Sequence, residues 1–269
     1  MKCKSLDSKF VDSSLEIKEF ITMPELPEVE TIVREMRESG LIGLKIESIS
    51  IFWHRSVADL SKDLFAKSIT DQTIVDIQRR GKFIVFSLSQ DTLLVHLRMT
   101  GKFLIDQKKT MSDPHERLRL HLSDGRILHY IDQRKFGKWT LSGSKQTLEK
   151  IGLEPLSSSF TNPVFKNLLH GRRRQIKPFL LDQHFIAGLG NIYVDEALWE
   201  AKIHPARSAD SLNEQEIKAL HKAIIAVLKK GVENTGTSLG TSRSNYYSVS
   251  GRRGGNQEQL NVFRCDGMP

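Results

Sequence analysis

The chain has 269 residues, of which 39% are hydrophobic and 27% charged, a composition typical of globular proteins and a length sufficient for two domains. Its formal net charge of +8 favours a polyanionic partner such as nucleic acid, because Lys and Arg side chains that neutralise phosphates release counterions. Two cysteines, Cys3 and Cys265, exclude a disulfide framework and supply no set of four closely spaced zinc ligands. No apolar run is long enough to span a bilayer, and we expect a cytoplasmic protein without a membrane partner.

The first half of the chain predicts one helix followed by many short strands. Residues 1–22 are polar and lack periodicity, and we expect them to be a non-native N-terminal extension. The segment MPELPEVETIVREMRESG predicts a helix, because Pro27 suits a first helical turn and Gly40 can end the helix. From Lys45 to Ser142, runs such as TIVDIQ, KFIVFSL and RILHYID are separated by turn signals, which predicts an antiparallel β-sandwich or barrel.

The second half of the chain changes to helical spacing after an expected linker at 154–163. Apolar residues recur at intervals of three and four in PVFKNLLHGRRRQIKPFLLDQ, NIYVDEALWEAKI and NEQEIKALHKAIIAVLKKGVEN. The sequence FIAGLGN between the first two outlines a turn between helices, as in helix-turn-helix units. Residues 235–255, rich in Gly, Ser, Arg and Tyr, predict a long mobile loop. We therefore expect an α+β multidomain fold, with a β-sandwich domain at 23–153, a helical domain at 164–234 and a loose tail at 235–269.

Pro24 is a candidate nucleophile wherever it becomes the N-terminal residue. An α-amine has a pKa of about 8, against about 10.4 for a lysine, so about a tenth of it is unprotonated at neutral pH. As a secondary amine it can form a cationic iminium with an aldehyde-like sugar carbon, and Glu25 can transfer a proton at the sugar oxygen. Proline and glutamate are equally good residues for a helix start, and composition alone favours that plainer interpretation.

Three segments, MPELPEVET, GLGNIYVDEAL and IHPAR, together resemble formamidopyrimidine-DNA glycosylases, the bacterial base-excision enzymes for oxidised purines. The resemblance runs from Met23 to the end of the chain, and Leu26 distinguishes it from the related endonuclease VIII group, which has glycine there. It implies a helix-two-turn-helix DNA-binding domain and a bifunctional DNA glycosylase/AP lyase that excises 8-oxoguanine and formamidopyrimidines from duplex DNA. In that scheme Pro24 attacks the sugar C1′, Glu25 donates a proton and Glu28 is a supporting carboxylate.

The resemblance also implies a set of DNA-contacting residues. Lys82 in QRRGKF matches the lysine assigned to β-elimination, and Arg134 matches the arginine that contacts the orphaned cytosine. Met99 and Phe136 match side chains that occupy the space of the flipped base, whose extrusion costs a few kcal/mol. Lys135 replaces a commoner arginine, which keeps the charge but loses a bidentate fork. Taken singly, these residues are more typical of core or of a solvated face. The implied DNA-binding residues are His96, Met99, His115, Arg134, Lys135, Phe136, Arg172, Lys177, Gly190 and Asn191.

Both ends of the chain depart from the pattern of this family. With residues 1–22 and Met23 attached, the Pro24 nitrogen is an amide that cannot attack, so we expect translation to start at Met23 or the extension to be removed. The family ends in a four-cysteine zinc hairpin, and this sequence stops at Pro269, before the first ligand is expected. We therefore expect no metal or cofactor in this chain, and one structural zinc in a full-length member. Phe263 stands where a phosphate-binding tyrosine is usual, so weaker DNA binding is expected.

Two classes of function remain open from the sequence. The first is catalysis by a monomeric enzyme on double-stranded DNA that contains oxidised purines or abasic sites. The second is a non-catalytic damaged-DNA-binding protein, in which Pro24 is blocked and the zinc finger is missing. A third class, an RNA-binding helix-turn-helix protein, is disfavoured because the stacking aromatic residues that single-strand RNA readers use are not evident.

Overall fold

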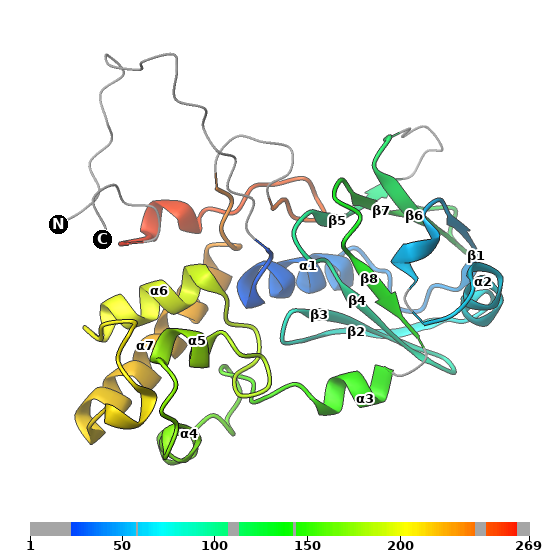
Figure 1. The fold of residues 1–269 in the computed structure, drawn as a ribbon. Coiled ribbons are helices and arrows are strands. Elements are labelled where there is room, and N and C mark those ends of the chain that lie inside the picture. Colours follow the sequence, from blue (N-terminus) through cyan, green and yellow to red (C-terminus); the bar gives the residue numbers. More distant parts are fainter. Residues whose placement is uncertain (1–22, 58, 107–112, 142–143, 240–245, 263–269) are drawn as a thin grey trace, which may run out of the picture.

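Two lobes, a β-sandwich and a group of helices, lie on either side of helix α1 (Leu26–Glu38) (Figure 1). α1 begins within the predicted segment, with Pro27 in its first turn, and it buries an apolar stripe along its length. The predicted α+β multidomain fold is confirmed. The computed structural model describes residues 23–57, 59–106, 113–141, 144–239 and 246–262.

The sandwich consists of two four-stranded antiparallel sheets. Aromatic rings from both sheets meet between them: Phe103 lies 6.4 Å from Phe86 and 5.7 Å from Trp139, measured between ring centroids. The sandwich is thus confirmed over the barrel. In pairing order, the strands are β1 (Ile46–Ile51), β6 (Glu116–Leu122), β7 (Ile127–Asp132) and β5 (Gly101–Asp106) in one sheet, and β2 (Ile74–Arg80), β3 (Phe83–Leu88), β4 (Thr92–His96) and β8 (Lys138–Thr140) in the other.

The sequence patterns missed strands β5 and β8 and two short helices, α2 (Lys62–Ile69) and α3 (Ser144–Glu149). Helix α2 interrupts a region that was predicted to be β throughout. The Ser61 side chain caps this helix by accepting a hydrogen bond from the Leu64 backbone N–H. Only two of its eight residues are buried, so its apolar periodicity is too weak to indicate a helix.

The helical lobe contains four α-helices, and the first of the three predicted helical segments is divided between two of them. The chain leaves the helical path after Leu169 because Gly171 adopts a φ of +69°, which is left-handed backbone that suits glycine. The helices are α4 (Asn162–Leu169), α5 (Ile176–Leu180), α6 (Asn191–Glu200) and α7 (Glu214–Glu233). The described chain also has three short 3-10 turns: η1 (His54–Ser56) between β1 and α2, η2 (Ala209–Ser211) between α6 and α7, and η3 (Asn256–Gln259) after α7.

Each lobe has its own hydrophobic core, and α1 contributes to both. Leu26 packs in the core of the helical lobe, whereas Val29 and Met36 pack in the core of the sandwich. The backbone N–H of Leu26 also donates to the Gly188 carbonyl in the turn before α6, at 3.0 Å. The start of α1 is therefore held by the helical lobe, although the rest of the helix belongs to the sandwich.

The segment after α7 is packed, and the expectation of a loose loop is wrong for its described residues. Thr237 is buried beside α1, and Tyr246 and Val249 belong to the sandwich core. The Glu35 carboxylate of α1 accepts a hydrogen bond from the Ser250 backbone N–H at 2.9 Å. Composition indicated flexibility here, but buried contacts with α1 order the segment.

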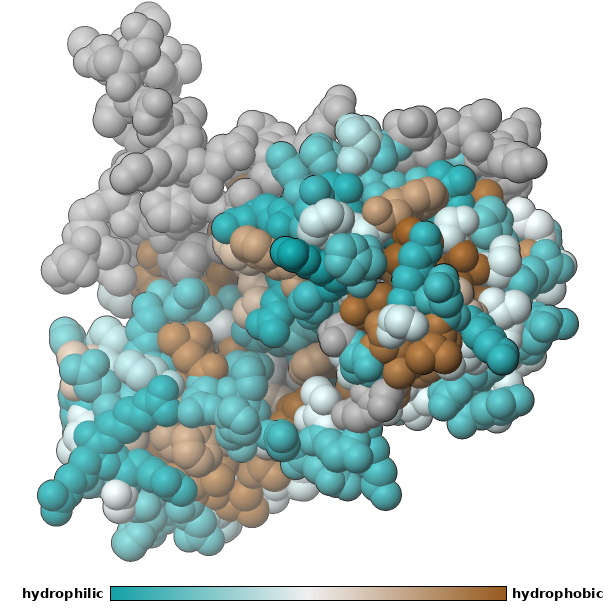
Figure 2. Space-filling view, turned by 45° about the vertical axis from the view of Figure 1, so that its right-hand side comes forward, coloured by the Kyte–Doolittle hydropathy of each residue, from teal (hydrophilic) through white to brown (hydrophobic). Residues whose placement is uncertain are grey.

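Hydrophilic residues cover most of the face drawn in Figure 2, and hydrophobic ones show through in patches on both lobes. Phe136 is among the exposed large apolar side chains, with 47% of its surface accessible. The plainer interpretation of Phe136 as a core residue is therefore wrong, and its ring is free to contact a partner. Within the described part of the chain, every helix is too short or too polar to cross a membrane.

Candidate active site and DNA-contact residues

The Glu25 carboxylate lies against the N-terminus of α6 and is only 3% exposed. It accepts hydrogen bonds from the backbone N–H groups of Gly190 at 2.7 Å, Ile192 at 3.0 Å and Tyr193 at 3.4 Å. The first N–H groups of a helix have no partner within the helix, and the helix dipole adds partial positive charge there. Glu25 therefore connects the start of α1 to the helical lobe, at the position next to Pro24, which is itself buried.

Two glycines of FIAGLGN allow α1 to approach α6 this closely. A Cβ atom added to Gly190 would lie 2.3 Å from the Glu25 Cδ, well inside van der Waals contact. Gly188 has a φ of +84°, and an added Cβ would lie 2.7 Å from the Leu26 Cβ. Asn191, the first residue of α6, follows these glycines and is exposed.

The Glu28 carboxylate lies in a buried network of hydrogen bonds that spans three parts of the chain. One of its oxygens accepts from the Glu25 backbone N–H at 2.8 Å. The other accepts from the Tyr193 hydroxyl at 2.8 Å and from the Thr237 backbone N–H at 2.7 Å. Glu28 thus ties α1 to α6 and to the segment after α7, and it fixes the Glu25 backbone.

Burial dominates the electrostatics of the three ionisable side chains at this site. It raises the pKa of Glu25 to about 7, against the opposing charge of Lys82 and the hydrogen bonds from α6. It also raises the pKa of Glu28, against the hydrogen bonds from Tyr193 and Thr237. It lowers the pKa of Lys82, against the attraction of the two glutamates. Glu25 therefore exchanges a proton near neutral pH, as a general acid must.

Lys82 occupies the tight turn between β2 and β3, directly after Gly81, whose φ is +58°. It is 5% exposed, and it is close enough to both carboxylates for their charges to act on its amine. The structure therefore brings together Glu25, Glu28, Lys82 and Gly190, which lie far apart in the sequence.

His96 ends β4, with its ring edge-on to Phe83 at a centroid distance of 4.7 Å. Its Nδ1 accepts a hydrogen bond from the Arg98 backbone N–H at 3.0 Å, so its ring proton is on Nε2. Burial, together with the charges of Arg98 and Lys82, lowers the pKa of His96 to about 3. The imidazole is therefore neutral and has one N–H available to donate, which is what a contact with a phosphate oxygen requires.

Met99, Arg134 and Phe136 form a contact cluster at the surface of the sandwich. The Arg134 guanidinium lies 4.7 Å from the centroid of the Phe136 ring, and its Nη1 lies 3.0 Å from the Met99 sulfur. Phe136 and Arg134 are exposed and Met99 is half-buried. Two apolar side chains and one guanidinium from two different loops are thus presented together, an arrangement suited to insertion between base pairs.

A buried carboxylate supports both of these loops. Asp132, at the end of β7, accepts hydrogen bonds from the Thr100 hydroxyl and from the Gly137 backbone N–H, the latter at 2.8 Å. The Thr100 hydroxyl oxygen in turn accepts from the Arg134 backbone N–H at 3.0 Å. Met99 and Phe136 are therefore held in fixed relative positions by a hydrogen-bonded bridge beneath them.

Lys135 lies in the loop that carries Arg134 and Phe136, and His115 lies beside the start of that loop. The Lys135 ammonium lies 4.2 Å from the centroid of the Trp53 ring, a cation–π contact, and Lys135 has a φ of +60°. The His115 carbonyl accepts a hydrogen bond from the Asp132 backbone N–H at 2.9 Å, and its Nδ1 lies 3.3 Å from the Arg117 guanidinium. Both residues therefore lie beside the cluster of Met99, Arg134 and Phe136.

Arg172 and Lys177 lie in the helical lobe, apart from the cluster on the sandwich. Arg172 is exposed in the segment between α4 and α5, with its guanidinium 4.9 Å from the centroid of the Phe185 ring. The Lys177 ammonium, on α5, forms an ion pair with Asp195 at 2.7 Å. A phosphate that binds Lys177 would therefore compete with Asp195.

Sequence reasoning missed several residues that organise the site. Tyr193 lies within the motif GLGNIYVDEAL, so the motif signalled its importance but not its hydrogen bond to Glu28. Thr237 carried no signal, because it falls in the segment predicted to be mobile. Asp132 and Thr100 look like ordinary strand and turn residues in the sequence, and only their contacts show that they join two loops.

The structural zinc that the resemblance implies has no ligand set in the described part of the chain. No group of three or more His, Cys, Asp or Glu side chains within the described ranges is placed to hold a metal ion. Cys3, Phe263 and Cys265 lie outside those ranges. The residues that the structure describes therefore do not fit a zinc ion.

Comparison with solved structures extends the likeness to the whole fold. The Lactococcus lactis Fpg protein in complex with DNA that contains an abasic site superposes with a TM-score of 0.78 at 40% identity, over 88% of this chain and 86% of that one. A mutant of the same protein bound to DNA that contains Fapy-dG has a TM-score of 0.79 at 40% identity, over 88% of this chain and 87% of that one.

Family models and curated relatives agree with this likeness. The formamidopyrimidine-DNA glycosylase N-terminal domain matches residues 23–139, and the H2TH domain of the same enzymes matches residues 151–243. The formamidopyrimidine-DNA glycosylase of Protochlamydia amoebophila is 46% identical over 249 residues, 92% of this chain and 90% of the relative. That of Enterococcus faecalis is 42% identical over 252 residues, 92% of this chain and 88% of the relative. The chain therefore belongs to the formamidopyrimidine-DNA glycosylase family, a family of DNA-binding enzymes of DNA repair.

Proposed function

We propose that this protein is a bifunctional DNA glycosylase and AP lyase, which excises 8-oxoguanine and formamidopyrimidines from duplex DNA with Pro24 as an N-terminal nucleophile. The observation that carries this proposal is the environment of Glu25. Its carboxyl is buried on the N-terminus of α6, beside Pro24, and its pKa is about 7. An exposed helix-capping glutamate would be fully ionised at neutral pH and would have no proton to donate.

The chemistry begins at the Pro24 nitrogen. Its lone pair forms a bond to the sugar C1′ while the bond from C1′ to the base breaks, and the base leaves with that electron pair and takes up a proton. The proline nitrogen then loses its own proton. When the bond between C1′ and O4′ breaks, O4′ takes a proton from Glu25 and a cationic iminium remains at C1′.

Strand cleavage follows from the electron demand of that iminium. A base removes a proton from C2′, the electrons form a double bond between C2′ and C3′, and the 3′-phosphate leaves with the electron pair of the C3′–O bond. Lys82 supports this step in the proposal, because burial lowers its pKa and so increases the fraction of neutral amine. Glu28 keeps Glu25 in place through the hydrogen bond from the Glu25 backbone N–H.

The proposed contacts with DNA rest on the contact cluster of Met99, Arg134 and Phe136 and on His96. Met99 and Phe136 would occupy the space that the extruded base leaves, and Arg134 would hydrogen-bond to the cytosine opposite the lesion. The neutral His96 would donate its Nε2 proton to a phosphate oxygen. In this proposal the residues that contact the DNA backbone are His96, His115, Lys135, Arg172, Lys177 and Asn191. Gly190 is not among them, because it is buried and its backbone N–H is donated to Glu25.

We further propose that the protein acts as a monomer in the cytoplasm, where bacterial DNA lies. All the residues assigned to catalysis, Pro24, Glu25, Glu28 and Lys82, come from one chain, and the helical lobe of that chain holds the two glutamates in place. The partner is double-stranded DNA that contains an oxidised purine or an abasic site. Solved complexes of the Lactococcus lactis protein with Fapy-dG DNA and with abasic-site DNA support this choice of substrates.

Borohydride trapping tests the proposal. Two forms are incubated with a duplex that contains an abasic site or 8-oxoguanine opposite cytosine: the full chain, and a form that begins at Pro24. Reduction converts an iminium into a stable amine, so the form with a free Pro24 amine should become covalently attached to DNA, and the full chain should not.

If the form that begins at Pro24 binds the duplex but neither cross-links nor nicks it, the proposal is wrong and the non-catalytic binding protein is the correct alternative. The intact mass of the natively expressed protein then shows which N-terminus exists in the cell.

A further inference from the structure

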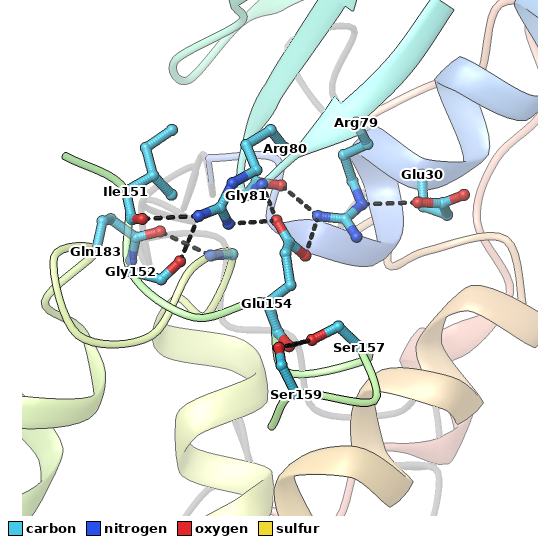
Figure 3. A network of polar contacts seen from close by, with 11 residues as sticks. Glu30, Arg79, Arg80, Gly81, Ile151, Gly152, Glu154, Ser157, Ser159 and Gln183 are labelled. Atoms are coloured by element: carbon cyan, nitrogen blue, oxygen red, sulfur yellow. Dashed lines mark hydrogen bonds and ion pairs between the residues drawn. The ribbon is translucent and has the colours of Figure 1, made fainter. Parts of the chain in front are cut away.

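The β2–β3 turn that carries Lys82 is held from outside the sandwich by one carboxylate. Glu154 lies in the segment that links the sandwich to the helical lobe, and its Oε1 accepts the backbone N–H of Gly81. Because Gly81 directly precedes Lys82, this hydrogen bond fixes the backbone at the start of the Lys82 side chain. Figure 3 shows the Glu154 carboxylate reaching up to this turn from the linker.

Two arginines hold the Glu154 carboxylate in place from either side (Figure 3). The Arg80 guanidinium contacts its Oε1 at 3.0 Å, and the Arg79 guanidinium forms an ion pair with its Oε2 at 2.8 Å. Arg79 also binds Glu30 of α1, at 2.7 Å. The Arg79 and Glu154 side chains are only 9% and 18% exposed, so each charge needs its partner to offset the loss of water.

The same linker is fixed to the turn before α6. Arg80 donates to the carbonyls of Ile151 at 2.7 Å and Gly152 at 2.6 Å. The Gly152 backbone N–H donates to the Gln183 carbonyl at 2.8 Å, and a Cβ atom on Gly152 would lie 2.4 Å from the Phe185 backbone. A continuous set of contacts thus runs from the Lys82 turn, through Glu154 and the linker, to the turn that presents Gly190 to Glu25.

We propose that Glu154 is a positioning residue for Lys82: by holding the Gly81 backbone, the linker carboxylate sets the Lys82 amine beside Glu25 and Glu28 and couples its position to the helical lobe. Glu154 touches no reacting atom in this scheme. The inference rests on the proposed function of Lys82 in strand cleavage. It adds that the contacts of the linker with both lobes are needed to place the Lys82 amine beside Glu25 and Glu28.

The test uses two substitutions at Glu154 and one control. Glu154→Ala removes the acceptor for Gly81, and Glu154→Asp keeps the charge but shortens the reach by one methylene. Glu30→Gln is the control, because it removes the other partner of Arg79 and leaves the hydrogen bond between Glu154 and Gly81 in place. Thermal melting shows that the compared variants are folded, and Glu154→Asp covers the case in which Glu154→Ala does not fold.

The first measurement follows Lys82 in the full chain without relying on activity. Wild-type Lys82 is buried, so it should react slowly with an acetylating reagent, as measured by mass spectrometry of the peptides. In both Glu154 variants its acetylation should become faster by at least about fivefold, through local opening of the turn, and its pKa by NMR should rise toward that of an exposed lysine. Glu30→Gln should keep wild-type values.

The second measurement separates catalysis from DNA binding. In the form with a free Pro24 amine, the Glu154 variants should lose about tenfold in the rate of strand nicking at saturating abasic-site DNA, with Kd changed by less than about twofold. If both Glu154 variants keep the wild-type acetylation rate and pKa of Lys82 and the wild-type rate of nicking, this inference is wrong and the proposed function still stands. An equal effect of Glu30→Gln also overturns it. If the wild-type protein neither traps nor nicks, the proposed function fails and this inference fails with it.

Discussion

The Glu25 carboxylate accepts a hydrogen bond from the Gly190 backbone N–H at 2.7 Å, and this hydrogen bond joins the start of α1 to the start of α6. Its geometry requires a glycine at position 190 and a buried carboxyl at position 25. Burial then raises the pKa of Glu25 to about 7. One packing contact between the lobes therefore sets both the position and the protonation of the group that we assign to proton transfer.

Gly190→Ala should separate α1 from α6. The new Cβ would lie 2.3 Å from the Glu25 Cδ, so Glu25 must move away from the N-terminus of the helix. We expect a loss of about 1–3 kcal/mol in the free energy of unfolding, as for other overpacked sites, and a slower trapping reaction. Gly255→Ala is the control, because its Cβ has only an ordinary contact at 3.6 Å and its φ is −105°. Equal thermal stability of the two variants would contradict the close approach.

Glu25→Gln should remove one limb of the pH–rate profile. The proton that Glu25 donates is lost as the pH rises through its pKa of about 7, whereas the Pro24 amine, with a pKa of about 8, becomes unprotonated, so the wild-type rate should pass through a maximum between these two values and fall above it. The amide cannot donate that proton, and we expect a loss of about a hundredfold in the trapping rate, with no descending limb above the maximum.

Folding stability gives a second measure of the same shift. The folded pKa of about 7 lies above the ordinary glutamate pKa of 4.5, so the folded state holds the Glu25 proton more tightly. The contribution of Glu25 to stability is full below pH 4.5 and declines as the pH rises to 7. Denaturant titrations across this range should show a steeper decline in wild type than in Glu25→Gln, which keeps the contribution of Glu28, whose pKa is also raised by burial. Parallel curves for the two proteins would mean that Glu25 has an ordinary pKa.

Arg134→Ala should weaken the discrimination for cytosine opposite the lesion. A guanidinium that hydrogen-bonds to a base edge contributes about 1–3 kcal/mol of discrimination, so the preference should fall by about tenfold or more. The substitution also removes the contacts with Phe136 and Met99. Arg34→Ala is the control, because Arg34 is an exposed arginine on α1 that pairs with Glu38. Unchanged ratios of excision rates for duplexes with different opposing bases would exclude Arg134 from this role.

His96 should remain neutral across the physiological pH range. Burial lowers its pKa to about 3, and its Nδ1 is occupied as an acceptor of the Arg98 N–H. In nitrogen-detected NMR spectra of the DNA-free protein, its ring signals should be constant from pH 8 to pH 5. As the pH falls below 6.5, His96 becomes protonated in the unfolded chain but stays neutral in the folded protein. The contribution of His96 to stability therefore declines toward pH 3. A titration midpoint near 6.5 would show an exposed ring.

Several features of the structure could be predicted because their signals are local. Alternating apolar residues identified most strands of the sandwich, and Pro27 indicated the start of α1. The glycines of FIAGLGN indicated a turn. The signal was too weak where an element is short: α2 has only Phe65 and Ile69 buried, and β8 has three residues.

The clustering of the site could be anticipated only through family resemblance, and the resemblance does not explain it. Glu154 illustrates the limit, since it looks like a linker residue in GLEPLSSS and yet it is the acceptor for Gly81. Thr237 lies in a stretch whose composition predicts mobility, but the Glu28 carboxylate accepts its backbone N–H. Such contacts join residues that are far apart in the chain, and no local pattern encodes them.

By itself, the sequence determined the family, the order of the sandwich and helical lobes, and the identity of Pro24 and Glu25 as a possible nucleophile and its neighbouring acid. These depend on residue type and on near neighbours in the chain. Only the tertiary structure decided that the pKa of Glu25 lies near neutral pH, that His96 is neutral and that Lys82 shares the buried site with both carboxylates. The reason is physical: a pKa depends on how much water and charge surround a group, and folding alone brings the two lobes together to exclude that water.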